Sequence, residues 1–179
     1  MSPAETILQS LDQKLDFPVE LSLYGRAALY LGYENPARDY ALSRDVDAVL
    51  WIGQAEELAA STNFWEALQA VNQELADQNA YISHLFTEDQ VVLRPQWREQ
   101  RVPIFGPWRK LRLSRLSDVD LFLSKMMRDD PLDQADARFI VDRAGLTPEE
   151  IRRAIESARV PAIPEIEEQF AICSKRFLP

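Results

Sequence analysis

The amino-acid sequence predicts an α+β protein, in which strands and helices are mixed up to about residue 116 and only helices follow. Three observations support this class. The 179 residues are 46% hydrophobic and 27% charged, as in globular proteins with a packed core. Segments that alternate apolar and polar residues, which predict strands, lie before Ser117. Apolar residues at helical spacing continue after it, so we expect one domain with a C-terminal helical bundle.

Helices and strands alternate in the first half of the sequence. Helices are expected where apolar residues recur every three or four positions, and strands where apolar and polar residues alternate. Glycines and prolines mark the ends of these segments. The expected elements are a helix over Thr6–Leu15, a strand over Val19–Tyr24, a short helix over Arg26–Leu31, a polar loop over Glu34–Leu42, a strand over Asp45–Ile52 and a long helix over Glu56–Gln78.

Three further strands are expected before the sequence becomes helical. They are separated by prolines and cover Tyr81–Phe86, Gln90–Leu93 and Leu111–Leu113. The clearest helix start in the last part is the capping box of Thr147 and Glu150, which has Pro148 at the first helical position. We therefore expect a first domain over residues 1–116 and a C-terminal helical region over residues 117–179, packed on the first.

The scarcity of histidine and cysteine excludes several kinds of site. One histidine, His84, and one cysteine, Cys173, cannot form a His-rich zinc site, a four-thiolate cluster or an internal disulfide, so a metal is expected to be held by oxygen. We interpret His84 as a packed or edge residue of its strand and Cys173 as a small buried hydrophobe. No segment has the apolar length of a signal peptide or a membrane span, so we expect a cytoplasmic protein without a membrane partner.

Two aspartates in the second expected strand are the most informative residues. Asp45 and Asp47 are two positions apart, which places both carboxylates on one face of a strand. Such a pair requires a cation, and Mg²⁺ is the natural one, because it prefers oxygen ligands and completes its shell with water and phosphate oxygens. About twenty residues upstream, the turn at Gly25 joins a strand to a helix, where backbone N–H groups can bind an anion. The alternative is a solvated strand end and an ordinary turn.

This order of strand, glycine turn, helix and strand with D-x-D resembles the polymerase-beta-like minimal nucleotidyltransferase superfamily. A Gly-Gly or Gly-Ser turn precedes T-x-D-x-D in that family, and the matching residues here are Gly25, Ser43, Asp45 and Asp47. The resemblance implies a nucleotidyltransferase-like mixed sheet flanked by helices, with Mg²⁺ bound by the two aspartates. It also implies that the nucleotide contacts Tyr24, Gly25, Arg26 and Ser43. Arg26 replaces the second small residue of the family's turn, where it either pairs with a triphosphate or prevents close approach to the backbone.

A second resemblance lies between Asp118 and Leu146. This segment is similar to the helical part of bacterial nucleotidyltransferase-like proteins grouped with the abortive-infection toxins, in which an acidic start precedes a lysine, an arginine and D-x-x-D. The matching residues are Asp120, Lys125, Arg128, Asp133 and Asp136. The resemblance implies that Lys125 and Arg128 approach the nucleotide phosphates, on one face of a helix that Ser117 caps and that also carries Leu121. The alternative is a cation paired with a neighbouring aspartate.

The implied reaction moves a nucleoside monophosphate from an NTP to a hydroxyl of RNA or protein, in a toxin-antitoxin or phage-defence setting. Asp45, Asp47 and Lys125 would be the catalytic residues. Enzymes of the superfamily usually carry a third carboxylate on a later strand, but we interpret the nearest acids, Glu88 and Asp89, as a turn. The alternative function is a catalytically degenerate protein of the same fold that binds a nucleotide, RNA or a protein partner.

The charges are unevenly distributed along the chain. Against a net charge of −9, the segment from Arg94 to Arg115 has seven basic residues and one acidic residue. Together with Trp97 and Trp108, this segment is either a groove for RNA or nucleotide phosphate, or a solvated arginine-rich sheet edge with packed tryptophans. A third function follows from the first of these, that of an RNA-binding or toxin-neutralising partner.

Overall fold

The computed structural model describes residues 1–178, with every side chain except that of Ser83. The chain forms two compact units. The first contains Met1–Thr87 and Val102–Arg115, and the second contains Glu88–Arg101 and the residues from Leu116 onward. The last break between the units lies between Arg115 and Leu116, one residue before the division that the sequence suggests, whereas residues 88–101 belong to the second unit.

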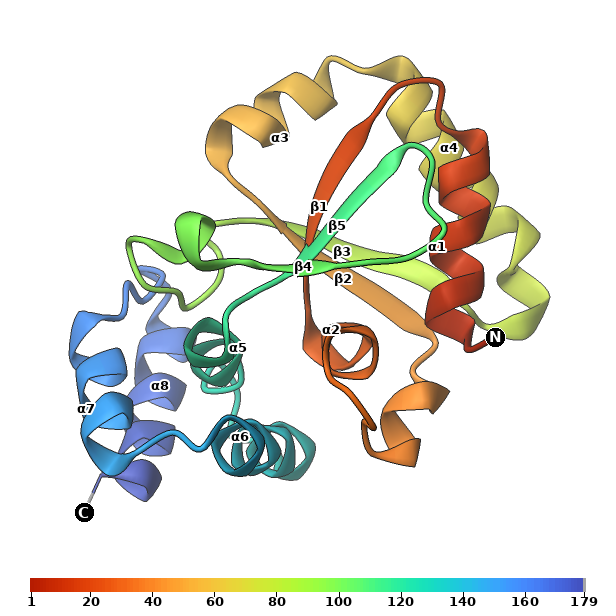
Figure 1. Ribbon diagram of the computed structural model, residues 1–179. Coiled ribbons are helices and arrows are strands. Elements are labelled where there is room, and N and C mark those ends of the chain that lie inside the picture. Colours follow the sequence, from red (N-terminus) through yellow and green to blue (C-terminus); the bar gives the residue numbers. More distant parts are fainter. Residues whose placement is uncertain (179) are drawn as a thin grey trace. The chain divides into compact units, whose positions relative to one another are not determined.

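The first unit is built on one mixed sheet of five strands in the order β3-β2-β1-β5-β4 (Figure 1). Their bounds are β1 (Val19–Tyr24), β2 (Asp45–Leu50), β3 (Tyr81–Thr87), β4 (Val102–Ile104) and β5 (Leu111–Arg115). β1 runs antiparallel to β2 and parallel to β5, β3 is parallel to β2, and β4 is antiparallel to β5. The sheet is thus mixed and flanked by helices, and the predicted α+β class is confirmed.

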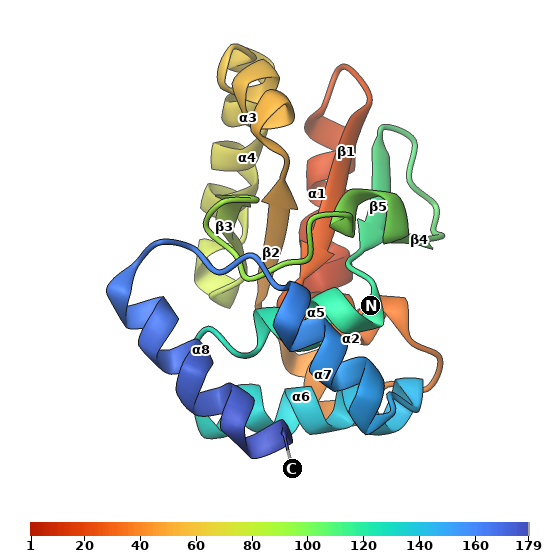
Figure 2. The ribbon, with the colours of Figure 1, turned by 90° about the vertical axis from the view of Figure 1, so that its left-hand side faces the viewer.

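Helices α1 and α4 lie side by side along one face of this sheet (Figures 1 and 2). The helices of the unit are α1 (Pro3–Lys14), α2 (Gly25–Gly32), α3 (Ile52–Ala59) and α4 (Thr62–Glu74), with short 3-10 helices over Arg38–Leu42 and Ala76–Gln78. Buried apolar residues of α1 and α4, such as Leu11 and Phe64, pack where the sheet presents Leu21 and Val46, all four almost inaccessible to solvent. This packing forms the core of the unit.

The opposite face of the sheet carries both aspartates of β2. Strand residues alternate between the two faces, and β1 pairs Tyr24 with Asp47 of β2. Asp45 and Asp47 alternate with the buried Val46 and Ala48, so the two carboxylates lie on the face that α1 and α4 leave uncovered. The pattern of β2 therefore determines which face carries the candidate site.

Two expectations for the first unit are wrong. The long helix expected over Glu56–Gln78 is broken, because the hydroxyl of Ser61 accepts a hydrogen bond from the N–H of Phe64 and starts α4 anew. Strand β2 ends at Leu50 and not at Ile52, where α3 begins. β4 was not expected, since Pro103 reads as a separator, but an edge strand tolerates a residue that cannot donate to the ladder.

The second unit is helical, as expected from Ser117 onward (Figure 2). Its helices are α5 (Asp118–Ser124), α6 (Pro131–Ala144), α7 (Pro148–Ser157) and α8 (Pro164–Phe177), with a 3-10 helix over Trp97–Gln100. The capping box of Thr147 and Glu150 is present at the start of α7. The strand expected over Gln90–Leu93 is wrong, because this segment makes only one isolated bridge, between Leu93 and Arg159.

Cys173 lies buried on α8, which confirms its interpretation as a small buried hydrophobe, and burial raises the pKa of its thiol. Among the described residues, no helix is both long and apolar enough to cross a membrane.

Candidate functional site

The glycine turn at the end of β1 lies against the second aspartate of β2. Gly25 begins α2 with a φ of +71°, a left-handed conformation that favours glycine. A Cβ placed on Gly25 would lie 3.0 Å from Oδ2 of Asp47. Any larger residue would therefore be strained and would press on the carboxylate, so glycine permits the close approach of turn and acid.

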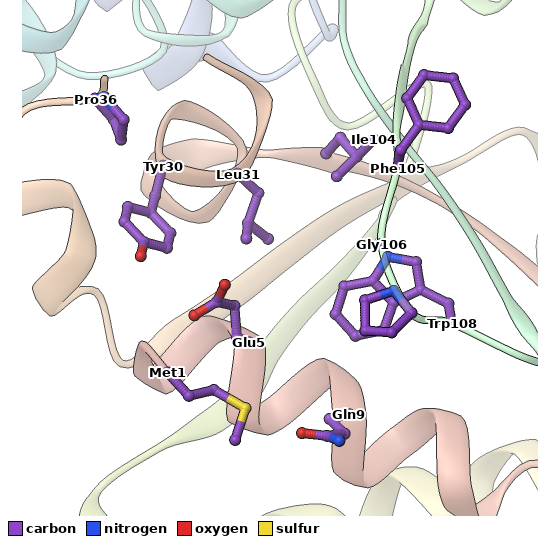
Figure 3. A pocket seen from close by; sticks show the side chains of 11 residues that line it. Met1, Glu5, Gln9, Tyr30, Leu31, Pro36, Ile104, Phe105, Gly106 and Trp108 are labelled. Carbon is purple, nitrogen blue, oxygen red and sulfur yellow. The ribbon is translucent and has the colours of Figure 1, made fainter. Parts of the chain in front are cut away.

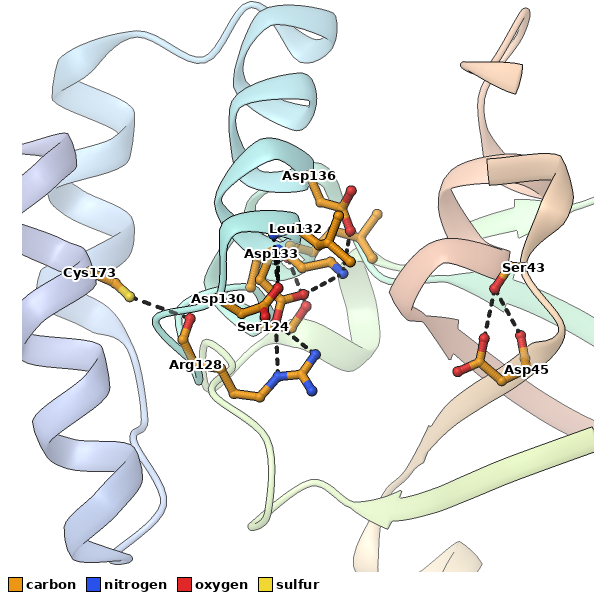
Figure 4. Close-up of polar contacts among 11 residues, drawn as sticks. Ser43, Asp45, Ser124, Arg128, Asp130, Leu132, Asp133, Asp136 and Cys173 are labelled. Carbon is orange, nitrogen blue, oxygen red and sulfur yellow. Dashed lines mark hydrogen bonds and ion pairs between the residues drawn. The ribbon is translucent and has the colours of Figure 1, made fainter. Parts of the chain in front are cut away.

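The first aspartate is oriented by a neighbouring hydroxyl. Ser43 Oγ donates a hydrogen bond of 2.7 Å to Oδ1 of Asp45 (Figure 4). Asp45 and Asp47 are both half-buried, so their carboxylates remain accessible to a ligand. Gly25, Ser43, Asp45 and Asp47, which the sequence pattern predicts to form one site, all belong to the first unit and gather at the end of β1 and the start of β2.

Arg26, the departure from the family's turn, has a partner in the same unit. Its guanidinium lies 5.4 Å from the centre of the Tyr40 ring, a cation–π contact with the 3-10 helix that precedes β2. The side chain is half-buried. Arg26 therefore helps to fix the segment that leads into the two aspartates.

Sequence reasoning missed His84 as a neighbour of the acidic pair. Nδ1 of His84 lies 3.5 Å from Oδ1 of Asp47, and 62% of the His84 side chain is exposed. β3 forms one edge of the sheet, so the interpretation of His84 as an edge residue is confirmed. Its place beside Asp47 adds a titratable nitrogen to the candidate site.

A bulge in β3 explains why His84 was missed. Val46 pairs with Ile82 but Asp47 pairs with His84, so β3 has one residue more than β2 between these pairs. A regular strand would place His84 on the face of the buried Ile82, away from Asp47. No local feature of the sequence predicts the bulge. The one signal in the sequence is that the single histidine lies in the strand that follows Asp45 and Asp47 along the chain.

The side chains of Asp45 and Asp47 provide carboxylate oxygens, the ligand type that Mg²⁺ prefers. Within residues 1–178, no group of three or more His, Cys, Asp or Glu side chains is placed to hold a metal ion. Asp45 and Asp47 offer two carboxylates, and Mg²⁺ at such a pair stays a prediction, since this ion would complete its shell with water and phosphate oxygens of a substrate. Glu88 and Asp89 form the turn that the sequence predicts, and Glu88 accepts a hydrogen bond from Nε1 of Trp97.

Lys125 and Arg128 belong to the second unit. Figure 4 shows Arg128 beside Asp133. Lys125 Nζ donates hydrogen bonds of 3.0 Å to Asp133 and 2.8 Å to Asp136, and all three side chains are buried. Arg128 donates from Nε to the other oxygen of Asp133 at 2.8 Å. The local ion pairs weighed as the alternative are thus present, and the role of Lys125 and Arg128 toward phosphate stays a prediction.

The prediction that Leu121, Lys125 and Arg128 share one helix face is wrong. Helix α5 ends at Ser124, so Lys125 is its C-cap residue and Arg128 lies in the following loop. On the first turns of α6, Asp133 binds both cations and Asp136 binds Lys125, so ion pairs and not helix periodicity bring Lys125 and Arg128 together.

The basic segment from Arg94 to Arg115, expected to be either a groove for RNA or nucleotide phosphate or a solvated sheet edge, is divided between the two units. Trp97 is fully buried, and Arg94 forms an ion pair of 2.9 Å with the buried Asp120, so these two residues are structural. Arg98, Arg109 and Arg112 are exposed. The packed-tryptophan interpretation therefore holds for Trp97, whereas binding of RNA by the exposed arginines stays a prediction.

A hollow of about 310 Å³ in the first unit is lined mainly by apolar and aromatic residues (Figure 3). Its walls include Tyr30, Leu31, Ile104 and Trp108, and it shares no residue with the acidic pair. Its one carboxylate, Glu5, already accepts a hydrogen bond from the backbone of Ser2 in the capping box of α1. This hollow offers apolar surface and no set of reactive groups.

No protein-family model, curated protein or solved structure matches this chain.

Proposed function

We propose that the first unit carries the nucleotide site of a nucleotidyltransferase, with Asp45 and Asp47 as ligands of Mg²⁺ and the turn at Gly25 as the phosphate-binding element. The observation that supports this most is the contact between turn and acid, in which a Cβ on Gly25 would lie 3.0 Å from Asp47 Oδ2. The absence of a side chain at Gly25 lets the first backbone N–H groups of α2 and the Asp47 carboxylate lie close together, where a cation on the carboxylate and a phosphate on the N–H groups would be neighbours.

Different groups of the site would bind the cation and the phosphates. Bound Mg²⁺ would neutralise charge on the phosphate oxygens. The Ser43 hydroxyl holds Asp45 in one orientation through the 2.7 Å hydrogen bond. The backbone N–H groups of the first turn of α2 face no intrahelical acceptor and are suited to donate to an anion. His84 lies at the rim of this site, with Nδ1 3.5 Å from Oδ1 of Asp47, and is assigned no part in binding the cation or the phosphates.

The proposed reaction transfers a nucleoside monophosphate to a hydroxyl of RNA or protein. The acceptor oxygen forms a bond with the α-phosphorus and its hydroxyl proton passes to solvent water. The bond between that phosphorus and the bridging oxygen breaks, and pyrophosphate leaves with the electron pair. A toxin-antitoxin or phage-defence setting is part of the same proposal, as the second resemblance implies.

Transfer of label from NTPs tests this function. The protein is incubated with Mg²⁺, each α-labelled NTP in turn and either RNA or protein acceptors. We expect incorporation by the wild type and a loss of more than about a hundredfold in Asp47→Asn, since a metal ligand contributes several kcal/mol to such a reaction. Asp77→Asn is the matched control, because Asp77 is an exposed aspartate of the same unit. Absence of incorporation, or equal incorporation by Asp47→Asn, would sink the proposal.

A second candidate is a protein of the same kind that binds a nucleotide without turnover. Two observations favour it: the described residues contain no three-ligand metal group, and Lys125 is paired with two buried aspartates. Calorimetry with ATP, GTP, CTP and UTP, followed by analysis of the recovered nucleotide, separates the two. Binding that requires Mg²⁺ and returns intact nucleotide, even with acceptors present, supports the second candidate and contradicts the first.

A further inference from the structure

Three aromatic rings form a row next to Asp47, on the sheet face that carries both aspartates of β2. The rings of His84 and Phe86 are stacked, with 5.0 Å between centroids and 14° between planes. Tyr24 meets Phe86 edge to face, with 6.1 Å between centroids. Tyr24 and His84 both pair with Asp47 of the intervening β2, so strand register sets this aromatic row of Tyr24, His84 and Phe86.

The aromatic row ends in an open ring. Phe86 and Tyr24 are half-buried, whereas 62% of the His84 side chain is exposed. One face of the imidazole is against Phe86, which holds the ring plane in place. The remaining surface of His84 is available to another planar group, which would continue the stack.

The open ring also lies where a nucleotide would bring such a group. His84 Nδ1 is 3.5 Å from Asp47 Oδ1, the carboxylate assigned to the cation. One ribose separates the base of a nucleotide from its phosphates, so phosphates bound near Asp47 bring the base within reach of rings on the same sheet face. Bases stack on aromatic side chains through their π faces, whatever the base.

We propose that the aromatic row is the stacking platform for the base of a nucleoside triphosphate, with His84 as the contact ring. This inference rests on the proposed function, because the triphosphate brings the base to β3. His84 then acts through its ring plane and not through its nitrogen. A phenyl ring at position 84 preserves the platform, whereas an aliphatic side chain of similar size removes it.

The test compares the affinity of the wild-type protein for ATP with its affinity for inorganic tripolyphosphate, by calorimetry in the presence of Mg²⁺. Tripolyphosphate has the same phosphate chain without base or ribose. We expect ATP to bind about tenfold tighter or more, the usual contribution of stacking one base. In His84→Leu this preference should fall by about tenfold while tripolyphosphate binds as before, and His84→Phe should restore it. Phe105→Leu, which removes an exposed ring outside the aromatic row, should leave it unchanged.

The outcomes separate this inference from the proposed function. Equal binding of ATP and tripolyphosphate by the wild type overturns the platform and leaves the phosphate site intact. A preference for ATP that persists in His84→Leu, or that His84→Phe fails to restore, also overturns it. Failure of both ligands to bind contradicts the proposed function itself. The wild-type comparison needs no variant, and the exposed position of His84 makes large effects on folding unexpected, which thermal melting checks.

Discussion

Gly25 is the residue on which the candidate site depends most, because two constraints coincide there. Its φ is +71°, and a Cβ would lie 3.0 Å from a carboxylate oxygen of Asp47. Gly145, at the C-cap of α6, has a similar φ of +66° but nothing within 4 Å of the Cβ position. A comparison of the two positions therefore distinguishes the effect of backbone strain, which both share, from the effect of contact with Asp47, which only Gly25 has.

Replacement of each glycine by alanine makes this comparison. Gly25→Ala and Gly145→Ala should each destabilise the protein by about 1–2 kcal/mol, the usual penalty of a left-handed conformation for an L-residue. Only Gly25→Ala should also lose most of the Mg²⁺-dependent binding of ATP, because its Cβ displaces the Asp47 carboxylate. Urea unfolding and calorimetry measure the two effects. ATP affinity equal in both variants would show that the turn does not contact the ligand.

At the scale of elements, Asp12 joins α1 to the start of β5. Its carboxylate accepts hydrogen bonds from the backbone N–H groups of Arg109 at 3.0 Å, Lys110 at 2.8 Å and Leu111 at 2.7 Å. Burial raises the pKa of the Asp12 carboxyl, but the three hydrogen bonds together lower the pKa by more than burial raises it. The net pKa is therefore below its ordinary value of 3.8. The ionised form of Asp12 therefore stabilises the fold.

The sign of this pKa shift predicts a loss of stability in acid. The contribution of Asp12 is complete above the unfolded pKa of 3.8 and is lost as the pH falls through the lower folded pKa. Asp12→Asn should lower the melting temperature at neutral pH and flatten its decline between about pH 5 and pH 2. Asp77→Asn, at an exposed position, should leave both unchanged. Parallel pH profiles for Asp12→Asn and the wild type would contradict this role.

Helices α5 and α6 are joined by the buried cluster of Lys125, Asp133 and Asp136. Lys125→Met removes the buried cation that binds Asp136 and one of the two cations that bind Asp133, and should cost about 3–5 kcal/mol of unfolding free energy. Arg128→Met removes a side chain that is 74% exposed and binds the same Asp133, and should cost less than about 1 kcal/mol. Urea unfolding measures both, and equal small losses would contradict a structural role for Lys125.

At the scale of the whole molecule, the sequence predicts what local rules determine. β1 is predicted with its bounds, because one sheet face is apolar and the other polar along Val19–Tyr24. The start of α7 follows from its capping box, and the order of Gly25 and the two aspartates indicates the site. These features need only neighbouring residues.

The remaining features depend on contacts between distant segments. Pro103 can occupy a strand because β5 pairs with it at a sheet edge, which the sequence around it does not reveal. The place of His84 depends on the bulge in β3, and one extra residue reverses the face of the strand. Helix α5 ends at Ser124, and the next residue, Lys125, binds Asp133 and Asp136, which lie on α6 after the intervening loop.

The central claim is that Asp45, Asp47 and the turn at Gly25 bind the phosphates of a nucleotide through Mg²⁺. A crystal structure of the protein with Mg²⁺ and a nonhydrolysable ATP analogue tests it most directly. We predict a cation about 2.1 Å from oxygens of both aspartates, with phosphate oxygens completing its shell beside the first turn of α2. A nucleotide bound elsewhere, or a cation that contacts neither aspartate, would contradict the account.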